Sequence, residues 1–171
     1  MIYNKVGFSI KRAGLEEVEL LHCMACEVFP HTYKEILSEE QIKYMMHWMY
    51  DVESLKRQML EHHHQYFIAY FGEEAVGYLS IRPDGDDCFH LEKIYVLPDY
   101  QHRHYGGEMF DFAVGYVRTN YPHVHALELN VNRYNSALDF YLKKGMKIDR
   151  QGDFDIGNGF YMNDYIMRLE F

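Results

Sequence analysis

The sequence lacks any stretch of 18 consecutive apolar residues, and its 171 residues include only three cysteines and four prolines. Without a long apolar run there is no candidate membrane span or signal sequence, so we expect a cytoplasmic protein. An odd number of cysteines, with Cys23 and Cys26 three positions apart, argues against a disulfide framework and fits a reducing compartment. Because no linker-like segment interrupts the chain, we expect one domain over residues 1–171.

Positive charge is also scarce, since 17 Lys and Arg against 26 Asp and Glu give a formal net charge of −9. The electrostatic field of a negatively charged protein repels phosphate backbones and anionic lipids, so neither nucleic acid nor a membrane is an expected partner. An acidic surface suits a cationic substrate, although acidic surfaces also serve solubility alone. The 16 Tyr, 11 Phe and 10 Met leave enough apolar surface for a homodimer.

The first part of the chain predicts one strand followed by helices. Residues 5–13 alternate apolar and polar side chains, which is typical of a strand. Residues 14–29 repeat apolar side chains at helical spacing, which puts Val18, Leu21, Ala25 and Val28 on one face. The sequence SEEQ at 38–41 is a capping box that predicts a helix from about 39 to 50, and residues 52–60 predict a third, short helix.

The middle of the chain predicts a β-meander and then a crossover. Three β-rich runs, at 65–71, 75–82 and 89–97, are separated by short polar turns. Residues 104–120 have one apolar helical face, and 123–131 form a further strand. A strand, helix and strand in this order imply a parallel crossover.

The last part predicts a short helix and a closing hairpin. Residues 135–145 carry Asn135 as an N-cap and Gly145 as a left-handed C-cap, while 146–156 and 160–171 flank a GNG turn. The main elements then follow the order β-α-α-β-β-β-α-β-α-β-β. That order predicts an α/β (α+β) fold with a mixed, mostly antiparallel sheet of about seven strands and helices on both faces.

Two glycines, Gly106 and Gly107, stand at the predicted start of the 104–120 helix. The beginning of a helix has backbone N–H groups without partners and a partial positive charge, so it suits a phosphate or diphosphate. Arg103 adds a cation at the same place. Alternatively, the glycines only relax a tight turn. Neither G-x-x-x-x-G-K-[ST] nor a G-x-G-x-x-G that opens a β-α-β unit is present, which excludes the commonest nucleotide-binding motifs.

The segment LEKIYVLPDYQHRHYGGEMF (91–110) resembles the acetyl-CoA motif of the GNAT superfamily of N-acetyltransferases, in which a strand ending YV-x-P leads into Q/R-x-x-G-x-G/A. Gln101, Arg103 and Gly106 match this motif, and His104 stands where it has its first glycine. The segment LELNVNRYNSALDFYLKKGM (127–146) resembles the family's N-x-x-A-x-x-F-Y-x-x-x-G-F block. The ending FDIGNGFYMNDYIM is similar to the branch that includes PaiA-type polyamine acetyltransferases.

The resemblance implies a GNAT-like fold and the transfer of an acetyl group from acetyl-CoA to a primary amine, by direct attack in a ternary complex and without a metal. A primary amine with a pKa of about 10.4 is only ~0.04% neutral at pH 7, so a base is needed. The resemblance implies Glu92 as that base, acting through water, and Tyr141 as the acid that protonates the departing thiolate. The alternatives are a salt-bridge role for Glu92 and a packing role for Tyr141.

The backbone of Ile94, Tyr95 and Val96 is expected to pair with pantetheine like an added strand, and one N–H group there can polarise the thioester carbonyl. The full set of cofactor contacts that we expect is Ile94, Tyr95, Val96, His102, Arg103, His104, Tyr105, Gly106, Gly107 and Asn135.

Three other functions stay open at this point: a non-enzymatic CoA-binding sensor or interaction module, a protein or peptide N-acetyltransferase, and a histidine-rich metal-binding protein. The histidines at 62–64 and the cysteines within 22–26 do not have zinc-ligand spacing, so no metal site is expected. Two groups of aspartates predict either ordinary turn chemistry or an acidic mouth for a polyamine. They are Asp84, Asp86 and Asp87 in a hairpin loop, and Asp153, Asp155 and Asp164 in the closing hairpin.

Overall fold

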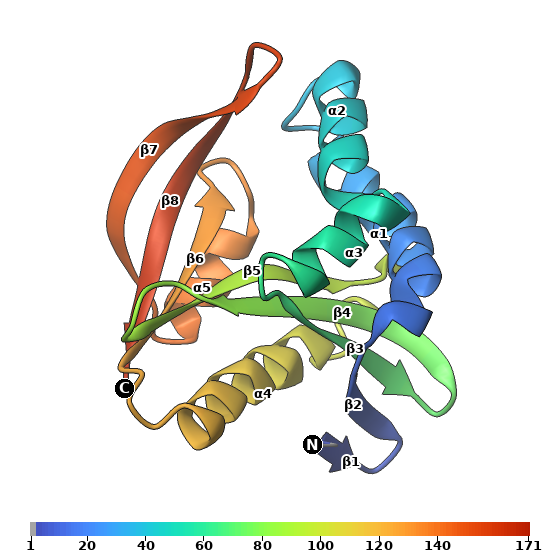
Figure 1. The fold of residues 1–171 in the computed structure, drawn as a ribbon, viewed down its shortest axis with the longest axis vertical. Helices are drawn as coiled ribbons and strands as arrows, with labels where there is room; N and C mark the ends of the chain where they lie inside the picture. Colours follow the sequence, from blue (N-terminus) through green and yellow to red (C-terminus); the bar gives the residue numbers. More distant parts are fainter. Residues whose placement is uncertain (1–2) are drawn as a thin grey trace.

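One mixed sheet of eight strands organises the protein, and a computed structural model describes it over residues 3–171 (Figure 1). The strand order across the sheet is β1-β2-β3-β4-β5-β6-β8-β7. The strands are β1 (Tyr3–Lys5), β2 (Phe8–Arg12), β3 (Gln65–Phe71), β4 (Glu74–Pro83), β5 (Cys88–Val96), β6 (Ala126–Asn132), β7 (Lys147–Gly157) and β8 (Phe160–Glu170). Within residues 3–171, no helix combines the length and apolar character needed to cross a membrane.

Helices cover the sheet on both faces, as predicted (Figure 1). They are α1 (Val18–Tyr33), α2 (Glu39–Tyr50), α3 (Val52–Leu60), α4 (Tyr105–Asn120) and α5 (Ala137–Lys143), with short 3₁₀ turns at Leu15–Glu17 and Pro98–Tyr100. Side chains of α1, α2 and α3 form one apolar core with one face of the sheet, and side chains of α4 and α5 form a second core with the other face. Strand residues alternate between the two cores, for example Ile68 and Tyr78 in the first against Phe67 and Leu79 in the second.

The predicted connections are confirmed. Strands β3, β4 and β5 form an antiparallel meander, and β7 and β8 close the chain as a hairpin. Strands β5 and β6, which α4 connects, pair in parallel. The helical face predicted for residues 14–29 is also confirmed, because Val18, Leu21, Ala25 and Val28 are all buried. Ser38 caps α2 by accepting a hydrogen bond from the Gln41 backbone N–H.

Three details differ from the predicted order. The single strand expected over 5–13 is two strands, β1 and β2, because Gly7 has a φ of +78° and lets the chain turn back within that segment. The predicted order also omits α3, the short helix that the pattern at 52–60 indicates. At α5 the N-cap position is Ser136 rather than Asn135, although the Asn135 Oδ1 accepts a hydrogen bond from the Ala137 N–H at 2.9 Å.

The parallel strands β5 and β6 separate soon after they meet. Their pairing covers only Cys88–His90 against Ala126–Glu128, yet β5 continues to Val96 and β6 to Asn132. Opposite β4, Ser80 pairs with Lys93 and Ile81 pairs with Leu91, so Glu92 is the extra residue of a β-bulge. A bulge bends its strand and interrupts regular pairing. The backbone edges of β5 and β6 beyond this point therefore face an opening in the sheet.

Candidate active site

A cleft of about 1270 Å³ lies where β5 and β6 diverge. Its walls come from the end of α1, the second half of β5, the start of α4, the second half of β6, and α5. Typical small-molecule pockets measure ~300–1,000 Å³, so this cleft is large enough for a long ligand together with a second molecule. It contains the two chemical environments described below, a helix N-terminus at one end and a group of titratable side chains at the other.

The N-terminus of α4 lines the cleft, where the resemblance predicts the diphosphate. The Glu108 N–H donates to the His104 carbonyl oxygen, so the three N–H groups before it, on Tyr105, Gly106 and Gly107, have no partner within the helix. His104 adopts the left-handed conformation, with a φ of 66°. A histidine thus adopts a left-handed conformation at the position where the motif has glycine, at a cost of about 1–2 kcal/mol.

The geometry of Gly106 favours the ligand explanation over the turn explanation. Its φ is not among the positive values, and a Cβ built on it would meet only Val96 Cγ2, at 3.8 Å. Neither backbone conformation nor packing therefore requires glycine at this position. Close approach of a ligand to the backbone is the remaining physical reason for it.

We expect Gly106→Ala to weaken acetyl-CoA binding about tenfold while the protein becomes more stable. Alanine has a higher helix propensity than glycine by roughly 1 kcal/mol, but its methyl group projects from the backbone that a diphosphate would approach. Isothermal titration with CoA and urea unfolding measure the two effects. Gly115→Ala is the matched control in the same helix, because a Cβ there meets nothing within 4 Å. Unchanged CoA affinity in Gly106→Ala would contradict the diphosphate site.

Lys144 is a cation near this helix start that sequence reasoning missed. Its Nζ would lie 3.5 Å from a Cβ on Gly107, and it bonds both carboxylate oxygens of Asp111 at 2.8 Å. Lys144 directly follows α5 and lies 37 residues after Gly107 in the chain, so only the fold brings the two together. A basic residue in the last turn of a helix is a weak signal by itself.

Most of the other expected cofactor residues line the cleft, but Arg103 does not. The cleft is lined by Ile94, Tyr95, Val96, His102, His104, Tyr105, Gly107 and Asn135. Arg103 is not among the lining residues, and its guanidinium lies 5.3 Å from the centre of the Tyr100 ring. Gln101 holds the loop in place, since its Nε2 donates to the Val96 carbonyl oxygen at 3.1 Å.

Tyr141 lies on α5 with its side chain in the core that α4 and α5 share, and it also lines the cleft. Burial, together with nearby Tyr33, raises the pKa of its phenol above the ordinary value, so the group is protonated at neutral pH. No residue in 3–171 forms a hydrogen bond with its hydroxyl. Tyr33 reaches the cleft from the end of α1, and its hydroxyl lies 3.2 Å from that of Tyr95.

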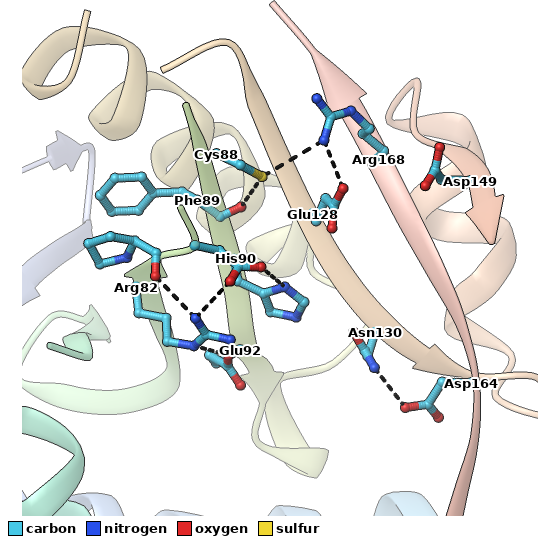
Figure 2. A network of polar contacts seen from close by, with 12 residues as sticks. Arg82, Cys88, Phe89, His90, Glu92, Glu128, Asn130, Asp149, Asp164 and Arg168 are labelled. Carbon is cyan, nitrogen blue, oxygen red and sulfur yellow. Dashed lines mark hydrogen bonds and ion pairs between the residues drawn. The ribbon is translucent and has the colours of Figure 1, made fainter. Parts of the chain in front are cut away.

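Glu92 lines the cleft at the bulge of β5, and its carboxylate is already paired. The Arg82 Nε donates to Glu92 Oε1 at 2.6 Å, and Figure 2 shows the guanidinium directed at this carboxylate. Burial alone would raise the pKa of Glu92, but His90, Lys93 and Arg82 outweigh it and hold the pKa below the ordinary value. Glu92 is therefore ionised at neutral pH, the state that a base requires.

A partly buried cluster of polar side chains lies beside Glu92 on β5, β6 and β8 (Figure 2). Ligand atoms of Asp84, His90 and Glu128 lie within 4.8 Å of one another, a set that can bind a metal in principle. Both oxygens of Glu128, however, accept hydrogen bonds from arginines, from Arg168 at 2.7 Å and from Arg150 at 2.9 Å. A metal ion would have to displace these guanidinium groups, so the arrangement fits a charge network better than a metal site.

Comparison with known proteins adds family information to this geometry. Residues 27–146 match the sequence model described as the acetyltransferase (GNAT) family. Spermidine N(1)-acetyltransferase from Thermoplasma acidophilum is 25% identical over 149 residues, which cover 84% of this chain and 91% of that protein.

Solved structures with the same fold are also found. PaiA N-acetyltransferase from Thermoplasma acidophilum, crystallised in complex with coenzyme A, matches with a TM-score of 0.80 at 24% identity, over 96% of this chain and 99% of that one. The ribosomal-protein-S18-alanine N-acetyltransferase from Escherichia coli matches with a TM-score of 0.72 at 14% identity, over 95% and 93% of the two chains. The predicted fold class is thereby confirmed.

Proposed function

Since the chain belongs to the acetyltransferase (GNAT) family, we propose that it transfers the acetyl group of acetyl-CoA to a primary amine, with a polyamine or another small amine as the favoured acceptor. The observation that carries this proposal is the cleft between β5 and β6. It joins a helix N-terminus suited to a diphosphate with a protonated phenol and an ionised carboxylate suited to acyl transfer.

In the proposed binding mode, the diphosphate of acetyl-CoA lies against the loop at 102–104 and the first N–H groups of α4, with Asn135 in contact from the far wall. Pantetheine runs along β5 and pairs with the backbone of residues 94–96, as an added strand would. The early end of the β5–β6 pairing supports this, because it leaves that backbone edge open. One of the N–H groups there would stabilise the oxyanion of the tetrahedral intermediate.

The proposed chemistry needs no covalent enzyme intermediate and no metal. The amine nitrogen attacks the thioester carbonyl carbon, and its surplus proton passes through water to Glu92. The carbon–sulfur bond then breaks, and the Tyr141 hydroxyl protonates the departing thiolate to give free CoA. The raised pKa of Tyr141 keeps the phenol protonated until the thiolate forms. Because a phenol is a weaker acid than a thiol, the tyrosinate that remains regains a proton from water, and Glu92 releases its proton to water, before the next turnover.

Two facts support a small cationic acceptor. The relative that aligns over 84% of this chain is a spermidine N(1)-acetyltransferase, and the net charge of −9 attracts cations to this chain. The same fold in the Escherichia coli relative modifies a ribosomal protein, so a peptide N-terminus is the second candidate acceptor. The third candidate is a CoA-binding sensor without turnover.

The test is thiol release from acetyl-CoA in the presence of a panel that includes spermidine, monoamines, amino acids and a peptide with a free N-terminus. We expect turnover that depends on the amine and is fastest with the polyamine. Faster turnover with the peptide would favour the second candidate, and CoA binding without turnover on any acceptor would favour the third.

A further inference from the structure

Asp164, on β8, is a buried carboxylate without a neutralising partner. Its exposed fraction is 5%, and its Oδ1 has no hydrogen-bond partner within residues 3–171. Its Oδ2 accepts one hydrogen bond, from the Asn130 Nδ2 at 3.2 Å, and Figure 2 shows the two side chains pointing towards each other between β6 and β8. Burying a charge in this way costs free energy unless something compensates it.

The surroundings of Asp164 contrast with those of Glu128 on the neighbouring strand. Glu128 is equally buried but holds two arginines, as described above. Arg133 is close enough to act on Asp164 electrostatically, but its guanidinium pairs with Asp153 and donates to the Gly152 carbonyl oxygen. Burial raises the pKa of Asp164, with Asn130 and Arg133 opposing the rise. Within residues 3–171 no side chain forms a salt bridge with this carboxylate, so a bound cation is what would favour its ionised form.

Asn130 connects the Asp164 carboxylate to the active-site cleft. It lies on β6 in the stretch that has separated from β5, it is exposed, and it lines the cleft. Because its amide N–H is directed at Asp164, its carbonyl Oδ1 remains as an acceptor for a ligand. Tyr33, at the end of α1, also lines the cleft, and its pKa is raised chiefly by burial, with a further contribution from Asp164.

We propose that Asn130 and Asp164 form a binding site for a second, protonated amino group of the acceptor. The Asn130 Oδ1 accepts a hydrogen bond from the ammonium, and Asp164 acts behind it as a positioning residue that orients the amide and supplies the counter-charge. This site makes the enzyme prefer diamines and polyamines to monoamines of the same length. The inference rests on the proposed acetyltransferase function and specifies which amines it favours.

The experiment compares kcat/KM for a linear diamine and for the monoamine of equal chain length, in the wild type and in Asp164→Asn. The change keeps the shape of the side chain and removes its charge. We expect the wild type to have the higher kcat/KM with the diamine. In the variant, we expect the ratio of kcat/KM for the diamine to that for the monoamine to fall at least tenfold. We also expect the KM for acetyl-CoA and the kcat with saturating monoamine to stay unchanged, and Tm to be equal or higher because an unbalanced buried charge is gone.

Two further variants keep the test decisive. Asn130→Leu, at an exposed position, should lose the same preference even if Asp164→Asn does not fold. Asp153→Asn is the matched control on the same hairpin, because Asp153 is exposed and already paired with Arg133, and its preference should stay as in the wild type. If the wild type is active and both test variants keep its diamine preference, or if the control loses that preference to the same extent, the binding site proposed here is overturned. The proposed acetyltransferase function would then still stand. A wild type inactive on every amine would overturn the proposed function as well.

Discussion

Replacing Tyr141 by phenylalanine is expected to lower kcat by about 10²–10³-fold while leaving the affinity for CoA nearly unchanged. Loss of a positioned general acid typically costs ~10²–10⁴-fold in rate. The ring would remain in the core that it shares with Phe110 and Phe140, so the fold should persist. Steady-state kinetics with acetyl-CoA and spermidine measure the loss, and CoA titration measures the affinity.

A control variant tests whether the loss is specific to the Tyr141 hydroxyl. Tyr134 also lines the cleft but is exposed, so Tyr134→Phe should keep most of the wild-type kcat. An unchanged kcat in Tyr141→Phe would remove the acid role. A parallel loss of Tm, CoA affinity and kcat would show that Tyr141 serves packing alone.

Replacing Glu92 by glutamine is expected to lower kcat/KM for the amine by roughly 10²-fold near pH 7, because the carboxylate that accepts the amine proton is gone. The pKa of Glu92 is depressed, so its base form is fully present from neutral pH upwards and is lost only as the pH falls through that lowered value. The ratio of wild-type to variant activity should therefore shrink between pH 7 and about 10, as the free amine fraction rises about tenfold per pH unit.

Arg82→Gln is the matched control for this prediction. It breaks the same ion pair but keeps the Glu92 carboxylate, so it should retain far more activity than Glu92→Gln. Equal losses in the two variants, with equal falls in Tm, would mean that the pair is structural. A ratio of wild-type to Glu92→Gln activity that does not change with pH would likewise contradict the base role.

The fold could be predicted from the sequence because its signals are local. Alternation marks the strands of the meander, apolar spacing marks the helices, and Gly145, with a φ of +89°, marks the end of α5. The sequence pattern does not distinguish β1 from β2, because Val6 and Gly7 lie inside one alternating run. The turn between the two strands becomes evident only from their pairing in the sheet.

The candidate site was only partly predictable, because its remaining features depend on tertiary structure. The bulge at Glu92 arises from the register between β4 and β5, and no residue pattern within β5 marks it. The contact of Lys144 with the start of α4 joins segments that are distant in the chain. Asp164 belongs to a hairpin rich in aspartate, and only the packed sheet shows that it is buried and unbalanced while Asp153 is exposed and paired.

In the proposed complex, the opening between β5 and β6 holds acetyl-CoA with its thioester between Tyr141 and Glu92. A crystal structure with a bisubstrate analogue, in which CoA is joined through an acetyl bridge to spermidine, tests it most directly. We expect the diphosphate against residues 102–107, the sulfur within hydrogen-bonding distance of the Tyr141 hydroxyl, and the polyamine on the side of Glu92. A diphosphate bound away from residues 102–107, or a sulfur remote from Tyr141, would contradict the proposed binding mode.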